Sequence, residues 1–490
     1  MVSHFIFRNP LRTTMFYKQL NFSINYINIR LQHQLAEITR QTCEYPPIVD
    51  MSEEGQRKHQ RQMWYDSIKT MPTVEEKLYE LAVQQRLHLK KYFLTCVPSS
   101  YTGIFFHQFI TRTHSIEGLP DKINDINVED ELSDIKDTFN EVLLNYYHNP
   151  WQSQRPKQLS DYLIEKNAGS RLLNQLITQC YKRLASRNDH ILESTIQHKP
   201  RINSFWWHGG FESEKDKMYE RNLAFRYEEF PAFVIRIKKP LSPIVEMNDS
   251  LCATSEVINY NYHPDVFGFP SRTDDWLSSI PGFWPGDPNE FPLLQVFTSD
   301  KLHPLLMRIE KYDLKKIENS LGLLTSFGYL NTIANYQGFT PFHDITYPLV
   351  VQTILTNGQD FTFFVYQLNT IAFHEDVDNK DRRNLCWTSG KLRLFETVED
   401  GQLKGVNEDV YRLLLKFMLN TPEVKEGQVL KPYLGVDTRT EDEIKNMRFF
   451  LRRMYSQQRA HDAHKDEVPM WVQIYKNHPE APPSPYVKLA

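Results

Sequence analysis

The sequence contains few cysteines, and none is placed for a metal or redox motif. The five cysteines of the 490-residue chain are Cys43, Cys96, Cys180, Cys252 and Cys386, and no two of them form a Cys-x-x-Cys pair. Zinc sites and the disulfide frameworks of small secreted proteins require closely or regularly spaced cysteines. We therefore expect reduced, mostly buried thiols, with neither a zinc site nor a disulfide framework.

Long apolar runs and phosphate-binding loops are also missing. No run of 18 apolar residues occurs, so no membrane-spanning helix is expected. The chain has 18 Gly against 28 Pro and contains no P-loop, no GxGxxG after a strand and no GxSxG elbow. The sequence therefore offers no motif for nucleotide binding or for serine hydrolysis, and no cofactor is expected.

A strong net charge is absent as well, but the charge is unevenly distributed. The formal net charge is −4, which alone gives no reason to expect nucleic-acid binding. Residues 1–36 hold four basic residues and no acid, and residues 445–465 hold six basic residues and one acid. The remainder, with 47 basic and 60 acidic residues, has a net charge of −13. The body is acidic, and the cationic residues concentrate at the two ends.

The stretch from Pro348 to Asn420 is the most informative part of the chain. Two β-rich runs, PLVVQTILT and QDFTFFVYQLNTIAF, flank Asn357-Gly358, which favours a two-residue type I′ turn. That turn would place Thr356 opposite Gln359. Both faces of the resulting hairpin are largely apolar, so we expect it inside a sheet and covered on both sides, by helices or by another protein.

A helix is predicted after this hairpin. Asn407 is a favourable N-cap, and apolar residues then recur at helical spacing, at Val410, Leu413, Leu414, Phe417 and Met418.

Several strings in the chain resemble one animal mitochondrial ribosomal protein family. They are YPPIVDMS, VEEKL, YQLNTIAF, NLCW and LFETVEDGQLKGVNEDV. The family was first numbered thirty in the small subunit and later placed on the large subunit, and it is also called programmed cell death protein nine. The resemblance covers roughly residues 45–420 and is strongest from Tyr336 onward.

The resemblance implies a non-catalytic structural constituent of the mitochondrial large ribosomal subunit, located in the matrix. Its implied partners are the large-subunit rRNA and neighbouring mitochondrial ribosomal proteins. Among these is a distant relative, large-subunit protein thirty-seven, and the relationship implies a pairing in which the doubly apolar hairpin would take part. The family supplies no catalytic residues to carry over.

The expected fold class is α+β, with a helical N-terminal region, a mixed α/β region around the hairpin, and an extended basic C-terminal tail. Residues 1–40 are interpreted as a mitochondrial presequence, since they are basic and rich in hydroxyl and amide residues. Residues 41–200 carry helical patterns, opened by a Thr73/Glu76 capping box and continuing from about Glu129 and around Leu173.

The mixed α/β region is expected to span residues 201–422. SFWWHGGF (204–211) and FPAFVIRIKKP (230–240) are predicted strands. Residues 260–300 are rich in Pro and Gly and should form ordered loop. A helix is predicted near residues 314–334.

The C-terminal extension, residues 423–490, is the best candidate for RNA contact. A capping box at Thr440 and Glu443 opens a helix with an apolar stripe on one side. Basic side chains form the candidate RNA contact, and a solvated basic helix face is the alternative; they are Lys445, Arg448, Arg452, Arg453 and Arg459. Trp206-Trp207 and Phe283-Trp284 could also stack bases, although buried core is the stronger expectation.

Catalytic chemistry has one candidate cluster, His343-Asp344 with His374-Glu375-Asp376. No HExxH motif accompanies it, and His374 is expected in a solvated loop where the hairpin strand ends. Residues 376–381, DVDNKD, lack the glycine and closing glutamate of a calcium loop. We therefore assign no catalytic and no metal residues. Two alternatives remain open: a matrix enzyme that uses His343 and His374, and an RNA-binding assembly factor that leaves the mature ribosome.

Overall fold

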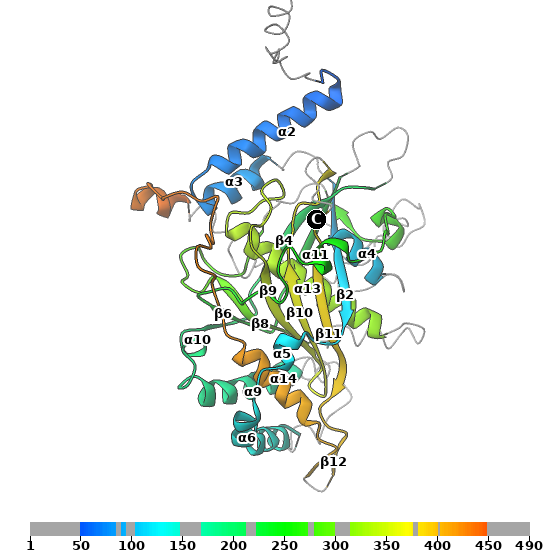
Figure 1. Ribbon diagram of the computed structural model, residues 1–490, viewed down its shortest axis with the longest axis vertical. Helices are drawn as coiled ribbons and strands as arrows, with labels where there is room; N and C mark the ends of the chain where they lie inside the picture. Colours follow the sequence, from blue (N-terminus) through cyan, green and yellow to red (C-terminus); the bar gives the residue numbers. More distant parts are fainter. Residues whose placement is uncertain are drawn as a thin grey trace, which may run out of the picture. The chain divides into compact units, whose positions relative to one another are not determined.

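The computed structural model describes residues 50–84, 90–94, 103–147, 168–211, 222–272, 279–298, 314–375, 381–399 and 402–447. The fold is α+β, with helices dominating the N-terminal region, and its described strands form two main β-sheets and a small two-stranded one (Figure 1). The chain divides into two compact units, residues 1–62 and 63–490, and these sheets belong to the second unit. The predicted presequence, residues 1–40, lies outside the described residues.

The helices are α2 (Glu53–Thr70), α3 (Val74–Gln84), α4 (Gly103–Ile110), α5 (Asp121–Asn124), α6 (Glu129–Tyr147), α9 (Ala168–Leu184), α10 (Asp189–Leu192), α11 (Ser250–Thr254), the 3-10 helix η1 (Pro264–Phe267), α13 (Leu314–Tyr336) and α14 (Glu408–Leu419). The strands are β1 (Lys91–Leu94), β2 (Thr113–Glu117), β3 (Thr195–His198), β4 (Ile202–His208), β5 (Leu223–Glu229), β6 (Phe233–Ile237), β7 (Ser271–Arg272), β8 (Phe291–Thr298), β9 (Leu349–Thr356), β10 (Asp360–Leu368), β11 (Asn384–Arg393), β12 (Thr397–Glu399) and β13 (Gln402–Lys404).

Strands from distant parts of the sequence meet in both main sheets. The larger sheet has the order β2-β11-β10-β9-β8-β6-β3, and the smaller has the order β4-β5-β1-β7. β2 runs parallel to β11, β8 runs parallel to β9, and β1 runs parallel to β5. The predicted regional boundary at residue 200 stays a prediction, although β1 and β2 precede it and pair with strands that follow it.

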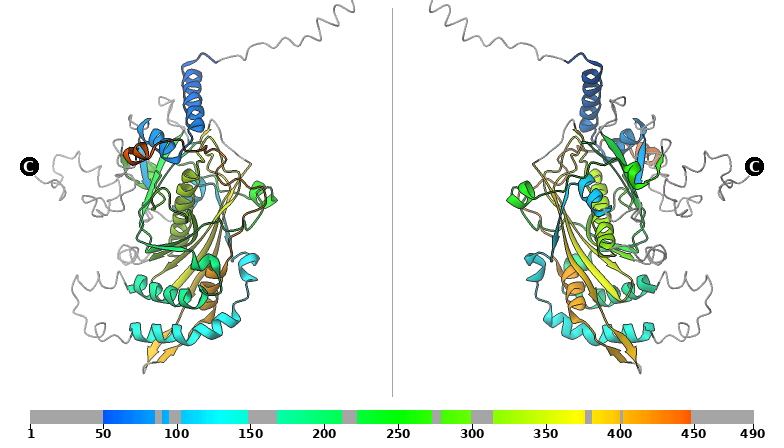
Figure 2. Two further views of the ribbon diagram at one scale, coloured as in Figure 1. Left: turned by 90° about the vertical axis from the view of Figure 1, so that its left-hand side faces the viewer. Right: turned by 90° about the vertical axis from the view of Figure 1, so that its right-hand side faces the viewer.

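Helix α13 lies between the two sheets and is buried on all sides from Ser320 onward. Figure 2 shows it lying lengthwise against the seven-stranded sheet. Phe327 on this helix contacts the ring of Trp206 in β4 at 4.9 Å between centroids and that of Tyr366 in β10 at 6.4 Å. Buried polar residues of this helix form hydrogen bonds; Asn331, for example, donates to Ser204 Oγ of β4 at 2.8 Å. α13 therefore joins the two sheets through shared aromatic packing.

The opposite face of the larger sheet is covered by α14, with α6 and α9 beside it (Figure 1). The ring of Phe363 in β10 packs edge-on against Phe417 of α14, with 5.2 Å between centroids, and Phe139 of α6 contacts Tyr411 of α14. The prediction that the hairpin is covered on both sides is confirmed, and the cover consists of helices of the same chain. Neither face of the hairpin is therefore exposed to a partner. The expectation that the hairpin takes part in pairing with a second protein is not supported.

The predicted register of the hairpin is wrong by two residues. Thr356 pairs with Phe361 instead of Gln359. Asn357 does not adopt positive φ; its side chain accepts hydrogen bonds from the backbone N–H groups of Gln359 and Asp360, at 2.9 and 2.7 Å. This Asn-capped loop therefore replaces the type I′ turn. Because the shift is an even number, each side chain keeps its predicted face.

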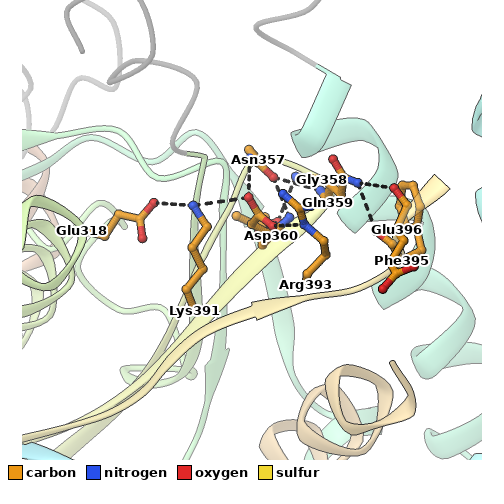
Figure 3. A network of polar contacts seen from close by, with 10 residues as sticks. Glu318, Asn357, Gly358, Gln359, Asp360, Lys391, Arg393, Phe395 and Glu396 are labelled. Atoms are coloured by element: carbon orange, nitrogen blue, oxygen red, sulfur yellow. Dashed lines mark hydrogen bonds and ion pairs between the residues drawn. The ribbon is translucent and has the colours of Figure 1, made fainter. Parts of the chain in front are cut away.

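Ion pairs hold the tip of this hairpin to neighbouring elements (Figure 3). Lys391 of β11 lies 3.3 Å from a carboxylate oxygen of Glu318 in α13 and 3.2 Å from one of Asp360. Arg393 pairs with the other oxygen of Asp360 at 3.1 Å. Gln359 donates to the backbone carbonyls of Phe395 and Glu396. The loop is thus fixed to α13 and to the end of β11.

The expectation of ordered loop over residues 260–300 is wrong for its last part. Residues 291–298 form β8, an interior strand of the larger sheet. Pro292 is accommodated because the ladder to β6 is irregular there, between Ile235 and Arg236, as is usual for a proline inside a sheet.

The helices predicted from capping signals are confirmed. Glu76 N donates to Thr73 Oγ1 at 3.4 Å, and Thr73 Oγ1 lies 2.8 Å from a carboxylate oxygen of Glu76. Asn407 caps α14 by accepting from Asp409 N at 3.0 Å. The prediction of reduced, buried thiols holds for Cys180, Cys252 and Cys386, the cysteines among the described residues.

Candidate functional site

His343 is buried in a tight turn after α13. Its Nδ1 lies 3.0 Å from Thr340 Oγ1, and Thr340 and His343 also exchange two backbone hydrogen bonds, of 2.9 and 3.2 Å. Burial, reinforced by the ammonium groups of Lys69 and Lys77, lowers the pKa of His343 to about 4. The imidazole is therefore neutral at physiological pH and a weak base.

Asp344 uses its carboxylate to join two loops. Oδ1 accepts from the backbone N–H groups of Ile345 and Ile371, at 2.9 and 2.8 Å. Oδ2 accepts from the Thr370 hydroxyl at 2.7 Å and lies 3.9 Å from a guanidinium nitrogen of Arg382. These contacts connect the segment after α13 to the segment after β10, which is a structural role.

The expectation that His374 lies in a solvated loop is wrong. Only 4% of His374 is exposed. Its ring centroid lies 5.1 Å from that of Phe342 and 6.2 Å from that of Trp207. Glu375 is exposed, and its backbone N–H donates to Asn222 Oδ1 at 2.8 Å. Asp376, the last member of the sequence cluster, lies outside the described residues.

Other buried titratable groups gave no signal in the sequence, because each is an isolated polar residue in an apolar run or on a helix. His107 Nδ1 lies 2.5 Å from Ser320 Oγ, and burial lowers its pKa to about 4. Burial and the charge of Arg112 lower the pKa of His208 to about 3. Burial lowers the pKa of Lys77 to about 8, and its ammonium donates to the Tyr433 carbonyl at 2.5 Å.

These groups do not converge on a reaction centre. Within the described ranges, no group of three His, Cys, Asp or Glu side chains is placed to hold a metal ion. The groups lie in separate contacts and bind neighbouring backbone, hydroxyl or aromatic groups. These contacts stabilise the fold.

The tryptophan groups are largely core. Trp206 and Trp207 are buried, and Trp206 Nε1 donates to the Ile110 carbonyl at 3.0 Å. Phe283 is also buried, whereas Trp284 is 45% exposed. The first pair therefore cannot stack on nucleic-acid bases.

The basic C-terminal helix begins as predicted, with Thr440 N donating to Glu443 Oε2 at 2.8 Å. Lys445 is exposed and lies 3.7 Å from Asp442 and 3.9 Å from Glu441. The other four candidate RNA contacts, Arg448, Arg452, Arg453 and Arg459, lie outside the described residues. On the apolar side, Met447 packs on the small cluster formed by Leu78 and Ile280.

Ion pairs and hydrogen bonds fix the segment before this helix to α3. Arg439 pairs with Glu75 of α3 at 2.9 Å and with Asp437 at 2.7 Å. Both carboxylates raise the pKa of Arg439 above its ordinary value. Gly435 N donates to the Pro72 carbonyl at 3.0 Å. The start of the basic helix is thereby placed on the body of the protein.

Within the described ranges, no helix is both long and apolar enough to span a bilayer. A family model described as mitochondrial 28S ribosomal protein S30 (PDCD9) matches residues 13–422. The matched stretch contains both main sheets together with α13 and α14, and it ends before the basic C-terminal helix.

Proposed function

Because the chain belongs to the mitochondrial 28S ribosomal protein S30 (PDCD9) family, and is thus a mitochondrial ribosomal protein of the matrix, we propose that it is a structural constituent of the large ribosomal subunit. In this role it holds neighbouring proteins and rRNA in place for translation and carries out no reaction itself. The observation that carries the proposal is the family match, which covers the core of the fold. The family's name refers to the small subunit, whereas the resemblance of the sequence strings implies the large one.

The use of the ionisable residues supports a scaffolding role over an enzymatic one. Asp344 is occupied by backbone and hydroxyl donors, and the imidazole of His343 is neutral and turned to Thr340. General acid–base catalysis needs such groups to converge on a space for substrate. The partners of the scaffold are the large-subunit rRNA and neighbouring ribosomal proteins, with the related large-subunit protein thirty-seven among them.

We further propose that the C-terminal extension contacts rRNA. Its candidate residues are Lys445, Arg448, Arg452, Arg453 and Arg459. Guanidinium and ammonium groups neutralise phosphates and release counterions, so this contact should weaken steeply with salt. Arg439 and Glu75 place the start of the helix, and the four arginines follow later in the sequence.

Sedimentation of a mitochondrial lysate on sucrose gradients tests the function. A stoichiometric large-subunit protein stays in the large-subunit peak after a high-salt wash. Recovery in the small-subunit peak would contradict the large-subunit placement. Recovery only with precursor particles would identify an assembly factor, and recovery at the top of the gradient would favour a free enzyme.

A further inference from the structure

The first three turns of α2 bury almost nothing. From Glu53 to Gln62 every residue is exposed except Gly55, which is half-buried, and the buried residues of this helix are Tyr65 and Ile68 near its other end. Most helices in proteins owe their stability to an apolar face that packs on a core. This segment is instead polar on all sides, so packing on a core does not account for its helical conformation.

Local interactions account for the helical conformation of this segment. Ser52 caps the helix, with its Oγ accepting from Gly55 N at 3.0 Å. Glu53 and Glu54 occupy the first turn, where negative charge is favourable. Glu53 pairs with Arg57 at 2.6 Å, one turn along. The segment is thus kept helical without contributing to the core.

The composition of its second and third turns fits a phosphate-rich surface. Residues 56–62 read QRKHQRQ and carry three cations and no carboxylate, in a chain whose formal net charge is −4. Arg57 and Arg61 lie on the same side of the helix, separated by a rise of about 6 Å. Arginine forks bind phosphate oxygens bidentately, and amide side chains such as Gln60 add neutral donors to phosphate and sugar.

We propose that residues Gln56–Gln62 of α2 form a contact site for the phosphate backbone of rRNA in the large subunit. The inference rests on the proposed function and adds a second RNA contact, separate in sequence from the C-terminal extension. An acidic protein surface is the competing partner. RNA fits better, since a row of phosphates matches a segment that holds three cations, three amides and one histidine and no acid.

A photo-crosslinking amino acid at Gln60, in the full chain expressed in mitochondria, identifies the partner directly. Gln60 is exposed and uncharged, so the replacement keeps the cations. The expected crosslink contains rRNA. A chain that sediments with the large subunit but crosslinks only to protein, or to nothing, overturns this site and leaves the proposed function intact. A chain that is absent from the large-subunit peak overturns both.

Charge variants give an independent measurement. The triple variant R57A/K58A/R61A retains helix propensity and should leave the large subunit at lower salt than the wild type. In a plot of the logarithm of the bound fraction of the chain against the logarithm of the salt concentration, the magnitude of the slope should fall by about 2–3. E53Q removes the carboxylate that pairs with Arg57, lowers the negative charge beside the site and should shift dissociation to higher salt. The matched control K182A/R183A/R187A removes three cations that are exposed at and just after the end of α9. Equal salt dependence of the two triple variants overturns the proposal.

Discussion

Gly322 of α13 lies directly against the ring of Phe364 in β10. A Cβ atom at position 322 would come within 2.6 Å of Cε1 of that ring, well inside van der Waals contact. The missing side chain allows the central helix to approach the larger sheet closely. A glycine in the middle of a helix is unfavourable by about 1 kcal/mol relative to alanine, so its presence here reflects packing.

We therefore predict that Gly322→Ala destabilises the protein despite the better helix propensity. Forcing a methyl group into a filled core costs about 1–3 kcal/mol, which outweighs the propensity gain. Urea unfolding of the purified chain measures the change. The double variant Gly322→Ala/Phe364→Leu should lose less free energy of unfolding than the sum of the losses of the two single variants. The reason is that the smaller side chain at position 364 relieves the overlap with the new methyl group. Lys316→Ala, at an exposed position of the same helix, is the control; a loss no larger than in this control would contradict the prediction.

Local signals in the sequence predicted local structure well. Thr73, Asn407 and Thr440 each mark a helix start in the structure, because a cap depends only on residues within one turn. The even two-residue shift of the hairpin also kept the prediction of its buried faces correct. These features could be predicted because the interactions that determine them lie close together in the sequence.

Long-range relationships could not be predicted in this way. β1 pairs in parallel with β5, with Tyr92 opposite Phe225, and no pattern in either segment specifies that pairing. His374 follows the end of a strand, where loops are normally solvated, yet Phe342 and Trp207 from distant segments cover it. Whether a loop residue is buried depends on which distant segments pack against it, and the sequence of the loop itself does not contain that information.

Gln352 of β9 provides a second stability prediction. Its Nε2 donates to the Phe417 carbonyl at 2.7 Å and to the Leu293 carbonyl at 3.0 Å, and its Oε1 accepts from Asn420 at 3.1 Å. The Phe417 carbonyl lies in the last turn of α14, where intrahelical partners are missing. Gln352→Met should keep the volume but leave buried carbonyls unpaired, at a cost of about 1–3 kcal/mol.

Chemical denaturation compares this variant with Gln402→Met, at an exposed glutamine of β13. We expect the exposed change to lie within about 0.5 kcal/mol of the wild type. Equal stability of the two variants would show that the polar contacts of Gln352 contribute nothing.

His107 should make the stability of the protein depend on pH. Its Nε2 has no hydrogen-bond partner among the described residues, and its Nδ1 lies 2.5 Å from Ser320 Oγ, so no carboxylate is in contact to stabilise a charged ring. The pKa of about 4 in the folded state lies below the ordinary value of 6.5. The unfolded chain therefore binds the proton more tightly, and stability is lost as pH falls from 6.5 towards 4.

Protonation of His107 in the unfolded chain should lower the free energy of unfolding by about 1–2 kcal/mol between pH 7 and pH 5. His107→Asn removes the titrating group, and the free energy of unfolding of this variant should fall less over that interval. The same substitution at exposed His198 is the control and should keep the wild-type dependence. Identical pH profiles for wild type and His107→Asn would disprove the role of this histidine.

Two substitutions at Asp344 distinguish a structural role of its carboxylate from a catalytic one. Asn retains an oxygen that accepts from the N–H groups of Ile345 and Ile371, and its amide replaces the interaction with the Thr370 hydroxyl by donating to it. We therefore expect Asp344→Asn to fold within about 1–2 kcal/mol of the wild type, to enter the ribosome and to support mitochondrial translation. Asp344→Ala leaves two buried N–H groups unpaired, so this variant should lose about 3 kcal/mol or more of its free energy of unfolding and should be absent from the ribosome.

The measurement is the synthesis of labelled mitochondrial translation products in cells that carry only the variant chain. A folded, ribosome-bound Asp344→Asn protein that fails to support translation would indicate that the carboxylate acts chemically, because the shape of the side chain and its hydrogen bonds from Ile345 and Ile371 would be preserved.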